Sequence, residues 1–219
     1  MTSPTTPPPG IAARDPDEVC LRDGTRAWII PLLKTDRASL AEEFETLSPE
    51  SRRRRFLAPV MHLSESMLEQ LVDDVDGINH VALVLMAETA PGSQTPVPVG
   101  IARIVRYDAH PDAADLAVTV KDAWQGRGVA SALLAALIPQ RPARVTHILT
   151  EAVTDNPASL AMLRSLGTVR TRDSGQGTLE IEVDLEGLGP HREAQQVDTS
   201  RRWWLRSRDR LCTWLHPEE

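Results

Sequence analysis

The chain has 219 residues, of which 41% are hydrophobic, and its formal net charge is −7. This length suits one domain of ordinary size with tails, and the acidic balance excludes a general nucleic-acid-binding surface. The chain has only two cysteines and no uncharged apolar run of about 20 residues, so it is predicted to be a soluble cytoplasmic protein without disulfides or a membrane span.

The first third of the chain alternates between a tail, a strand and helices. Residues 1–24 are rich in proline and predict a disordered tail. Residues 25–33 predict a short strand, which Pro31 ends or places at a sheet edge. A helix carrying Leu40 and Phe44 is expected next. Ser48 and Ser64 are candidate N-caps of two further helices.

The middle of the chain predicts a hairpin and then a strand that leads into a helix. Residues 79–88 and 97–107 are expected to pair as antiparallel strands. From Leu116 to Val120, apolar side chains at every second position indicate another strand. Residues 129–138 carry apolar side chains at three- and four-residue spacing, which indicates an amphipathic helix.

Between that strand and helix lies the segment QGRGVA, residues 125–130. Its two glycines allow positive φ angles and close approach of a ligand to the backbone. The first N–H groups of the helix are unpaired and carry the positive end of its dipole, so the segment predicts a diphosphate site. Two alternatives are a dinucleotide fingerprint ending at Ser131, with Glu151 as the ribose-binding acid, and a tight turn without a ligand.

The last third predicts a strand at residues 145–152, a helix opened by Asn156, and a hairpin formed by 168–172 and 178–183. Residues 186–219 form an extension rich in arginine and tryptophan, which is expected to be partly helical. Such a basic amphipathic helix packs on its own domain or a second subunit more often than on a membrane.

Two of these segments resemble the motifs of the GNAT acetyltransferases. Residues 125–130 resemble the acetyl-CoA-binding motif Q/R-x-x-G-x-G/A, and residues 156–167 resemble the second motif, N-x-x-[AS]-x-x-[LM]-x-x-x-x-G. The stretches SPESRRRRFLAPVMHLSESMLEQL, NHVALVLMAE and DLAVTVKDAWQGRG resemble bacterial Pat-type protein lysine acetyltransferases. The resemblance implies that residues 25–185 form an α/β (α+β) GNAT fold. In that fold a mixed, mostly antiparallel twisted sheet has splayed central strands and flanking helices.

The resemblance also implies acetyl-CoA as the co-substrate, with no metal. The backbone of Val118 and Val120 would pair with the pantetheine arm, and Asn156 and Ser159 would reach the CoA from the second helix. The expected binding residues of the first motif are Gln125, Gly126, Arg127, Gly128, Val129, Ala130 and Ser131.

Acetyl transfer to an amine needs a base, because a free lysine has a pKa of about 10.4. Asp115 is the candidate catalytic base, at the position where Pat-type enzymes usually have a glutamate. His80 is a weaker candidate, since a histidine on an apolar strand is more often a core residue. The tyrosine that many GNAT enzymes use as general acid is Leu163 here, and the only tyrosine, Tyr107, ends the preceding strand.

The predicted function is therefore acetylation of lysine side chains of proteins, with an acyl-CoA synthetase as the expected partner. The alternatives are acetylation of a small amine, such as a polyamine or antibiotic, and a non-catalytic acyl-CoA sensor. The arginines at 52–55 are interpreted as a solvated helix face, or else as an attraction for an acidic substrate or the CoA phosphates. The tails leave no room for the nucleotide-sensing domain of some Pat-type enzymes, so no cyclic-nucleotide control is expected.

Overall fold

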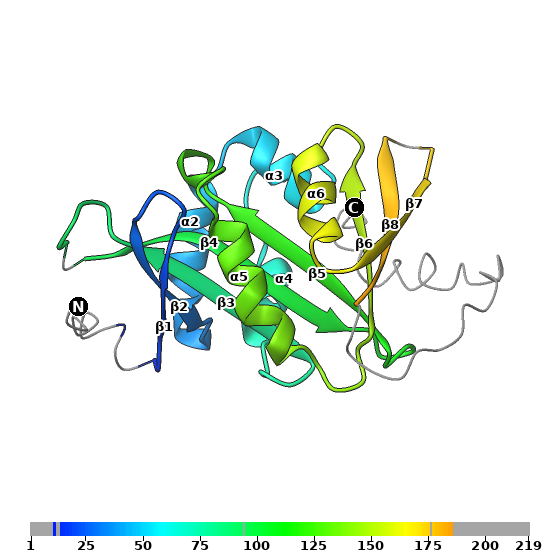
Figure 1. Cartoon of the computed structure of the whole chain (residues 1–219), viewed down its shortest axis with the longest axis horizontal. Coiled ribbons are helices and arrows are strands. Elements are labelled where there is room, and N and C mark those ends of the chain that lie inside the picture. The colour runs from blue at the N-terminus through cyan, green and yellow to red at the C-terminus, as the bar shows by residue number, and fades with distance from the viewer. Residues whose placement is uncertain (1–10, 12–13, 94, 176, 186–219) are drawn as a thin grey trace.

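The computed structural model describes residues 11, 14–93, 95–175 and 177–185. These residues form one eight-stranded sheet in the order β1-β2-β3-β4-β5-β6-β8-β7 (Figure 1). All neighbouring strands are antiparallel except β5 and β6, so the expected mixed, mostly antiparallel sheet is confirmed. The strands are β1 Asp17–Cys20, β2 Arg26–Pro31, β3 His80–Ala87, β4 Val97–Arg106, β5 Ala113–Val120, β6 His147–Val153, β7 Thr168–Asp173 and β8 Thr178–Asp184.

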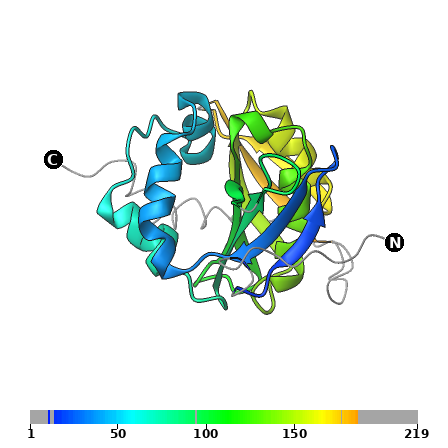
Figure 2. The ribbon, with the colours of Figure 1, turned by 90° about the vertical axis from the view of Figure 1, so that its left-hand side faces the viewer.

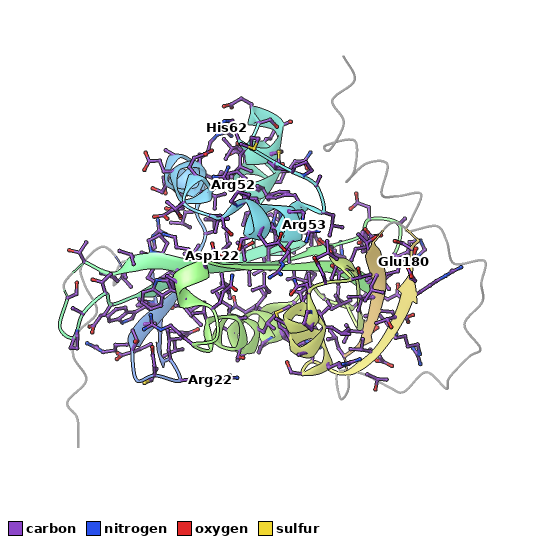
Figure 3. All side chains as sticks on the ribbon, turned by 90° about the horizontal axis from the view of Figure 1, so that it is seen from above. Arg22, Arg52, Arg53, His62, Asp122 and Glu180 are labelled. Atoms are coloured by element: carbon purple, nitrogen blue, oxygen red, sulfur yellow. The ribbon has the colours of Figure 1, made fainter. Side chains whose placement is uncertain are left out.

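Helices cover both faces of the sheet, as Figures 2 and 3 show. On one face lie α2 Arg37–Glu45, α3 Pro49–Phe56, α4 Glu65–Leu68 and the π-helical turn η2 Glu69–Asp73, and on the other lie α5 Val129–Leu137 and α6 Pro157–Arg164. Short 3-10 turns are η1 Lys34–Asp36, η3 Asp122–Trp124 and η4 Ile138–Gln140. Within the described ranges, no helix is long and apolar enough to span a bilayer.

The predicted N-caps explain where three helices begin. The hydroxyl oxygens of Ser48 and Ser64 accept hydrogen bonds from backbone N–H groups three residues later, both at 3.2 Å. The side-chain oxygen of Asn156 does the same for α6, also at 3.2 Å. Each cap satisfies one of the N–H groups that a helix start leaves unpaired.

The main core lies between the sheet and α5, where the apolar face of β5 meets the apolar face of the helix. Leu116, Leu133 and Leu137 belong to this core and are at most 5% exposed. Gly100 of β4 lets α5 approach closely, since a Cβ there would lie 2.7 Å from Cγ1 of Val129. This close contact positions the start of α5 relative to β4. It thereby also positions the preceding residues 125–130, which we call the glycine segment.

The sheet opens between β5 and β6. These two strands are paired only at Ala113 with His147 and at Ala114 with Ile148. One step further, the Thr150 hydroxyl donates to the Leu116 carbonyl at 3.2 Å, and among the described residues no strand pairs with the rest of β5 on that side. The splay that the resemblance implied is therefore present.

The domain begins earlier than the sequence indicated. Residues 17–20 were expected within the disordered tail, but they form β1 and pair with β2. Leu21 is buried in the main core, and Arg14 forms an ion pair with Asp36 at 2.5 Å. The prolines stop at Pro16, so nothing prevents the next residues from adding an edge strand. Residues 1–10 and the expected extension at 186–219 lie outside the described residues.

Candidate active site

A cavity of about 710 Å³ follows the opening between β5 and β6. It is lined by β5, the glycine segment, α6 and the side of α3 and η2 that faces the sheet. All the predicted site residues except Arg127 line it: Asp115, Val118, Val120, Gln125, Gly126, Gly128, Val129, Ala130, Ser131, Asn156 and Ser159. The structure thus brings together residues that lie up to 44 positions apart in the chain, from Asp115 to Ser159.

The free edge of β5 can bind an extended ligand. Residues of an antiparallel strand direct their peptide groups alternately to the two sides. Ala113 accepts from Tyr107 and Lys121 donates to Val99, both at 3.0 Å, so the odd-numbered residues face β4. Val118 and Val120 therefore turn their N–H and C=O groups into the opening. This edge suits a chain with its own amides, such as a pantetheine arm.

The glycine segment suits a diphosphate. Gly126 and Gly128 have φ angles of 75° and 93°. A Cβ on Gly126 would meet no atom within 4 Å, so the backbone there borders open space. Gly128 is the N-cap of α5, whose first N–H groups are left without helical partners. Backbone N–H groups and the positive end of the helix dipole then converge on one place, which favours an anion.

Arg127 does not line the cavity, contrary to its place in the predicted binding set. Its guanidinium forms an ion pair with Asp23 at 2.5 Å and donates to the Thr25 hydroxyl at 2.7 Å. It also lies 3.9 Å above the centre of the Trp124 ring. The side chain therefore anchors the glycine segment to the β1–β2 turn, which sequence motifs could not show because that turn is about 100 residues away.

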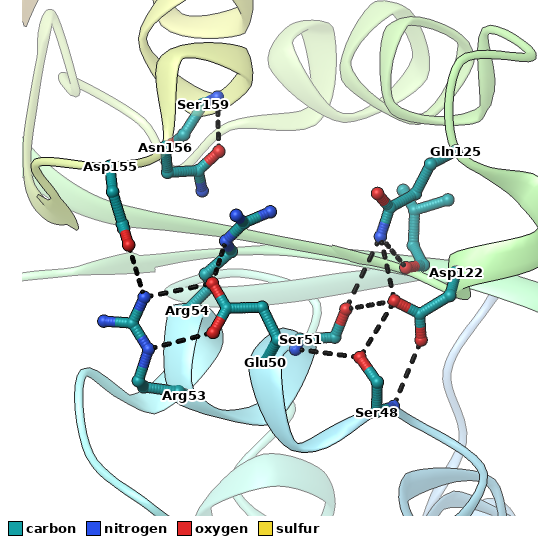
Figure 4. A network of polar contacts seen from close by, with 11 residues as sticks. Ser48, Glu50, Ser51, Arg53, Arg54, Asp122, Gln125, Asp155, Asn156 and Ser159 are labelled. Carbon is teal, nitrogen blue, oxygen red and sulfur yellow. Dashed lines mark hydrogen bonds and ion pairs between the residues drawn. The ribbon is translucent and has the colours of Figure 1, made fainter.

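Helix α3 is held on both sides of the opening (Figure 4). On one side, the Asp122 carboxylate accepts hydrogen bonds from the Ser48 backbone at 3.1 Å and the Ser51 hydroxyl at 2.7 Å. Burial raises the pKa of Asp122, but these hydrogen bonds outweigh it and leave the pKa below its usual value. On the other side, Arg53 donates to Asp155 at 2.8 Å. Helix α3 thereby spans the cavity.

Two arginine side chains line the cavity together with Asp115. Arg103 of β4 is 6% exposed and donates to the Leu71 carbonyl at 3.0 Å, and Arg55 of α3 lines the same space. Burial lowers the pKa of Arg103 to about 9; the positive charge of Arg55 adds to the shift and Asp115 opposes it. Burial likewise lowers the pKa of Arg55, and the negative charge of Asp115 again opposes this shift.

Arg103 was not among the predicted site residues, and Arg55 was predicted only as one of four arginines that form a solvated helix face or attract an acidic substrate or the CoA phosphates. Residues 52–55 do not form one surface, because successive residues of a helix point about 100° apart. Arg52 bonds to the carbonyls that follow α2, Arg53 and Arg54 pair with Glu50, and Arg55 turns inward. The only local feature that could have distinguished Arg55 is this rotation of about 100° per residue, which directs it away from Arg53 and Arg54.

His80 lies away from the cavity wall, in the interior beside Arg103. It is 7% exposed, and its Nε2 lies 3.5 Å from an Arg103 nitrogen. Burial, followed by the charge of Arg103, lowers the pKa of His80 to about 4, although Asp76 acts in the opposite direction. The imidazole is therefore neutral at pH 7, which agrees with a core histidine.

We expect His80 to make the protein less stable in mild acid. The unfolded histidine gains its proton near pH 6.5 and the folded one only near pH 4, so stability is lost as the pH falls between these values. Urea unfolding at pH 7 and pH 5 measures this loss. The loss should be smaller in His80→Gln and unchanged in the control His62→Gln, whose side chain is 79% exposed. An equal loss in all three proteins would contradict the assignment.

The described residues offer no unengaged tyrosine as a general acid. Leu163, which occupies the tyrosine position of the motif, is 1% exposed within the core. Tyr107 does line the cavity, and its hydroxyl donates to the Leu149 carbonyl at 3.0 Å. A departing anion would have to draw the Tyr107 proton from this bond or take one from water.

Comparisons with known proteins place this arrangement in a family. Residues 49–168, more than half of the chain, match the model described as the acetyltransferase (GNAT) family. "Acetyltransferase Pat" of Mycolicibacterium smegmatis is 33% identical over 171 residues, which are 78% of this chain and 49% of that protein. The chain therefore corresponds to about half the length of this relative.

Two solved structures share the fold. The GNAT domain of S. lividans PAT superposes with a TM-score of 0.66 and 29% identity, covering 78% of this chain and 97% of that one. The Salmonella typhimurium protein yncA, described as a putative acetyltransferase with acetyl-CoA, superposes with a TM-score of 0.55 and 20% identity. It covers 77% of this chain and 99% of its own, and at this identity it supports the fold only.

Proposed function

The chain belongs to the acetyltransferase (GNAT) family, and on that premise we propose that it transfers the acetyl group of acetyl-CoA to lysine side chains of proteins. The observation that carries the proposal is the cavity that Asp115 lines together with the part of β5 that β6 leaves unpaired. That edge, the glycine segment and the start of α6 would hold the three parts of a CoA thioester. Asp115 then lies at the end where the acetyl group would project.

In the proposed reaction the lysine nitrogen bonds to the acetyl carbon while the carbon–sulfur bond breaks. One proton must leave the nitrogen, and the Asp115 carboxylate is in the cavity to accept it, directly or through a water molecule. Backbone N–H groups of the free β5 edge can hold the carbonyl oxygen as negative charge develops on it. Thr150 already occupies the Leu116 carbonyl, so the first free groups belong to Val118.

The acceptor follows from the relatives and from charge. The resemblance of the sequence to Pat-type protein lysine acetyltransferases supports a protein acceptor, and an acyl-CoA synthetase in the cytoplasm is the partner we propose. The net charge of −7 attracts the cationic surface around a target lysine. A small amine is the second candidate, because a further cavity of about 560 Å³ adjoins the first and could enclose one.

A competition experiment tests the choice of acceptor. The protein is incubated with acetyl-CoA, a candidate acyl-CoA synthetase, and a panel of polyamines and aminoglycosides, and the acetylated products are identified by mass spectrometry. We expect the synthetase lysine to be modified fastest. If a small amine is acetylated orders of magnitude faster than any protein lysine, the protein acceptor is wrong.

A further inference from the structure

The further cavity lies on the α2–α3 face of the sheet and shares six lining residues with the first one. Its volume is about 560 Å³, and most of its wall is apolar, from residues such as Ile30, Leu40 and Phe44. The two cavities share a short stretch of wall, which we call the junction: Arg55, Phe56, Leu71, Arg103, Ala117 and Thr119. Two arginines, Arg55 and Arg103, therefore line both cavities.

Positive charge exceeds negative charge at the junction. Asp115 is the carboxylate whose charge acts on both Arg55 and Arg103, and these two arginines also repel each other. His80, which packs on Arg103, is neutral at pH 7 because its pKa is about 4. Two guanidinium groups and one carboxylate thus line the first cavity at this place, and an excess of charge in the interior is costly unless a ligand compensates it.

The guanidinium of Arg55 has capacity to bind such a ligand. Among the described residues it has no hydrogen-bond partner, and its only recorded contact is the ring of its neighbour Phe56, 4.8 Å away. In Arg103, a single guanidinium nitrogen both donates to the Leu71 carbonyl and makes the 3.5 Å contact with His80. Arginine presents its N–H groups as a planar fork that matches the two oxygens of a carboxylate.

The position of the junction indicates where that carboxylate would come from. A thioester chain held by Val118 and Val120 ends beside Ala117 and Thr119, whose small side chains leave room for an acyl group. An acetyl group carries no charge and therefore cannot neutralise the arginines. An acyl group with a second carboxylate a few bonds beyond the carbonyl would reach them and balance their charge.

We propose that Arg55 and Arg103 form a carboxylate subsite that accepts the distal end of a dicarboxylic acyl group, so that malonyl- and succinyl-CoA are donors beside acetyl-CoA. The inference rests on the proposed acyl-CoA cavity, but not on a protein lysine as acceptor. The transfer itself is the one described above: a carbon–nitrogen bond forms, the carbon–sulfur bond breaks, and Asp115 accepts the proton. The distal carboxylate remains unchanged in the product.

Binding measured without an acceptor tests the subsite. Isothermal titration compares succinyl-CoA with its uncharged analogue, in which the distal carboxylate is an amide of the same shape. We expect the carboxylate to bind tighter by about tenfold or more, as for other charge-assisted hydrogen bonds. Arg55→Gln should bring the two dissociation constants together. Arg172→Gln removes the same charge from an exposed position of β7 outside the cavity and should keep the difference.

A second arm separates the acyl group from the other possible source of a carboxylate, an amino-acid acceptor. With acetyl-CoA as donor, free lysine and lysinamide are compared as acceptors. If the wild type has a lower KM for free lysine than for lysinamide, and Arg55→Gln loses this difference, the arginines bind the carboxylate of the acceptor. That result would overturn the proposal. Equal affinity of the wild-type protein for succinyl-CoA and its amide analogue would also overturn it, whether or not protein lysines are acetylated.

Discussion

Asp115→Asn should lower the rate of acetyl transfer at neutral pH by about 100- to 10,000-fold, the usual cost of losing a general base. Asparagine keeps the shape of the side chain but cannot accept the proton. Binding of acetyl-CoA should change little, because the groups expected to hold CoA belong to the β5 backbone, the glycine segment and α6. The loss should therefore appear in kcat rather than in the dissociation constant.

The pH profile separates a base from a structural residue. The wild-type rate should rise with pH as the acceptor amine loses its proton, and Asp115→Asn should partly recover toward pH 10, where a free lysine is largely neutral unaided. A matched control is Asp112→Asn, which changes an acid three residues earlier that does not line the cavity. An undiminished rate for Asp115→Asn would assign the proton to water, since His80 is buried and does not line the cavity.

Elements whose pattern is local were predictable from the sequence. The alternation along β5 placed Leu116 and Val118 on one face, and the caps at Ser48 and Asn156 began their helices where expected. The glycine segment also lay where its motif indicated. In each of these cases the interactions that determine the structure lie within a few residues of one another, so residue propensity and spacing are sufficient to predict it.

Features that depend on distant partners were not predictable. The inward turn of Arg55 matters because α3 packs across β5, some 60 residues later in the chain, and no local pattern records that packing. Arg127 stands inside a ligand-binding motif, yet Asp23 and Thr25 draw its side chain away. Strand β1 forms because the edge of β2 is available for pairing. This pairing outweighs the weak strand propensity of a segment of only four residues.

The glycine segment leads to the second large expected effect: Gly128→Val should abolish binding of acetyl-CoA. Gly128 has a φ of 93°, which a branched residue adopts only under strain, and its Cβ would lie 3.0 Å from Cγ of Arg22. The N-cap of α5 must then shift, and the N–H groups that are expected to hold the diphosphate shift with it. Because several of these groups move together, no partial site should remain.

Thermal unfolding with and without ligand measures this loss. At 100 times its dissociation constant, acetyl-CoA should stabilise the wild-type protein by about 2.7 kcal/mol, and Gly128→Val by nothing. The control is Gly175→Val in the β7–β8 hairpin, whose φ of 80° imposes similar strain outside the cavity. Both variants should lose stability without ligand, but only the control should regain some when acetyl-CoA is added. If Gly128→Val responds to acetyl-CoA as the wild type does, the diphosphate does not bind at the start of α5.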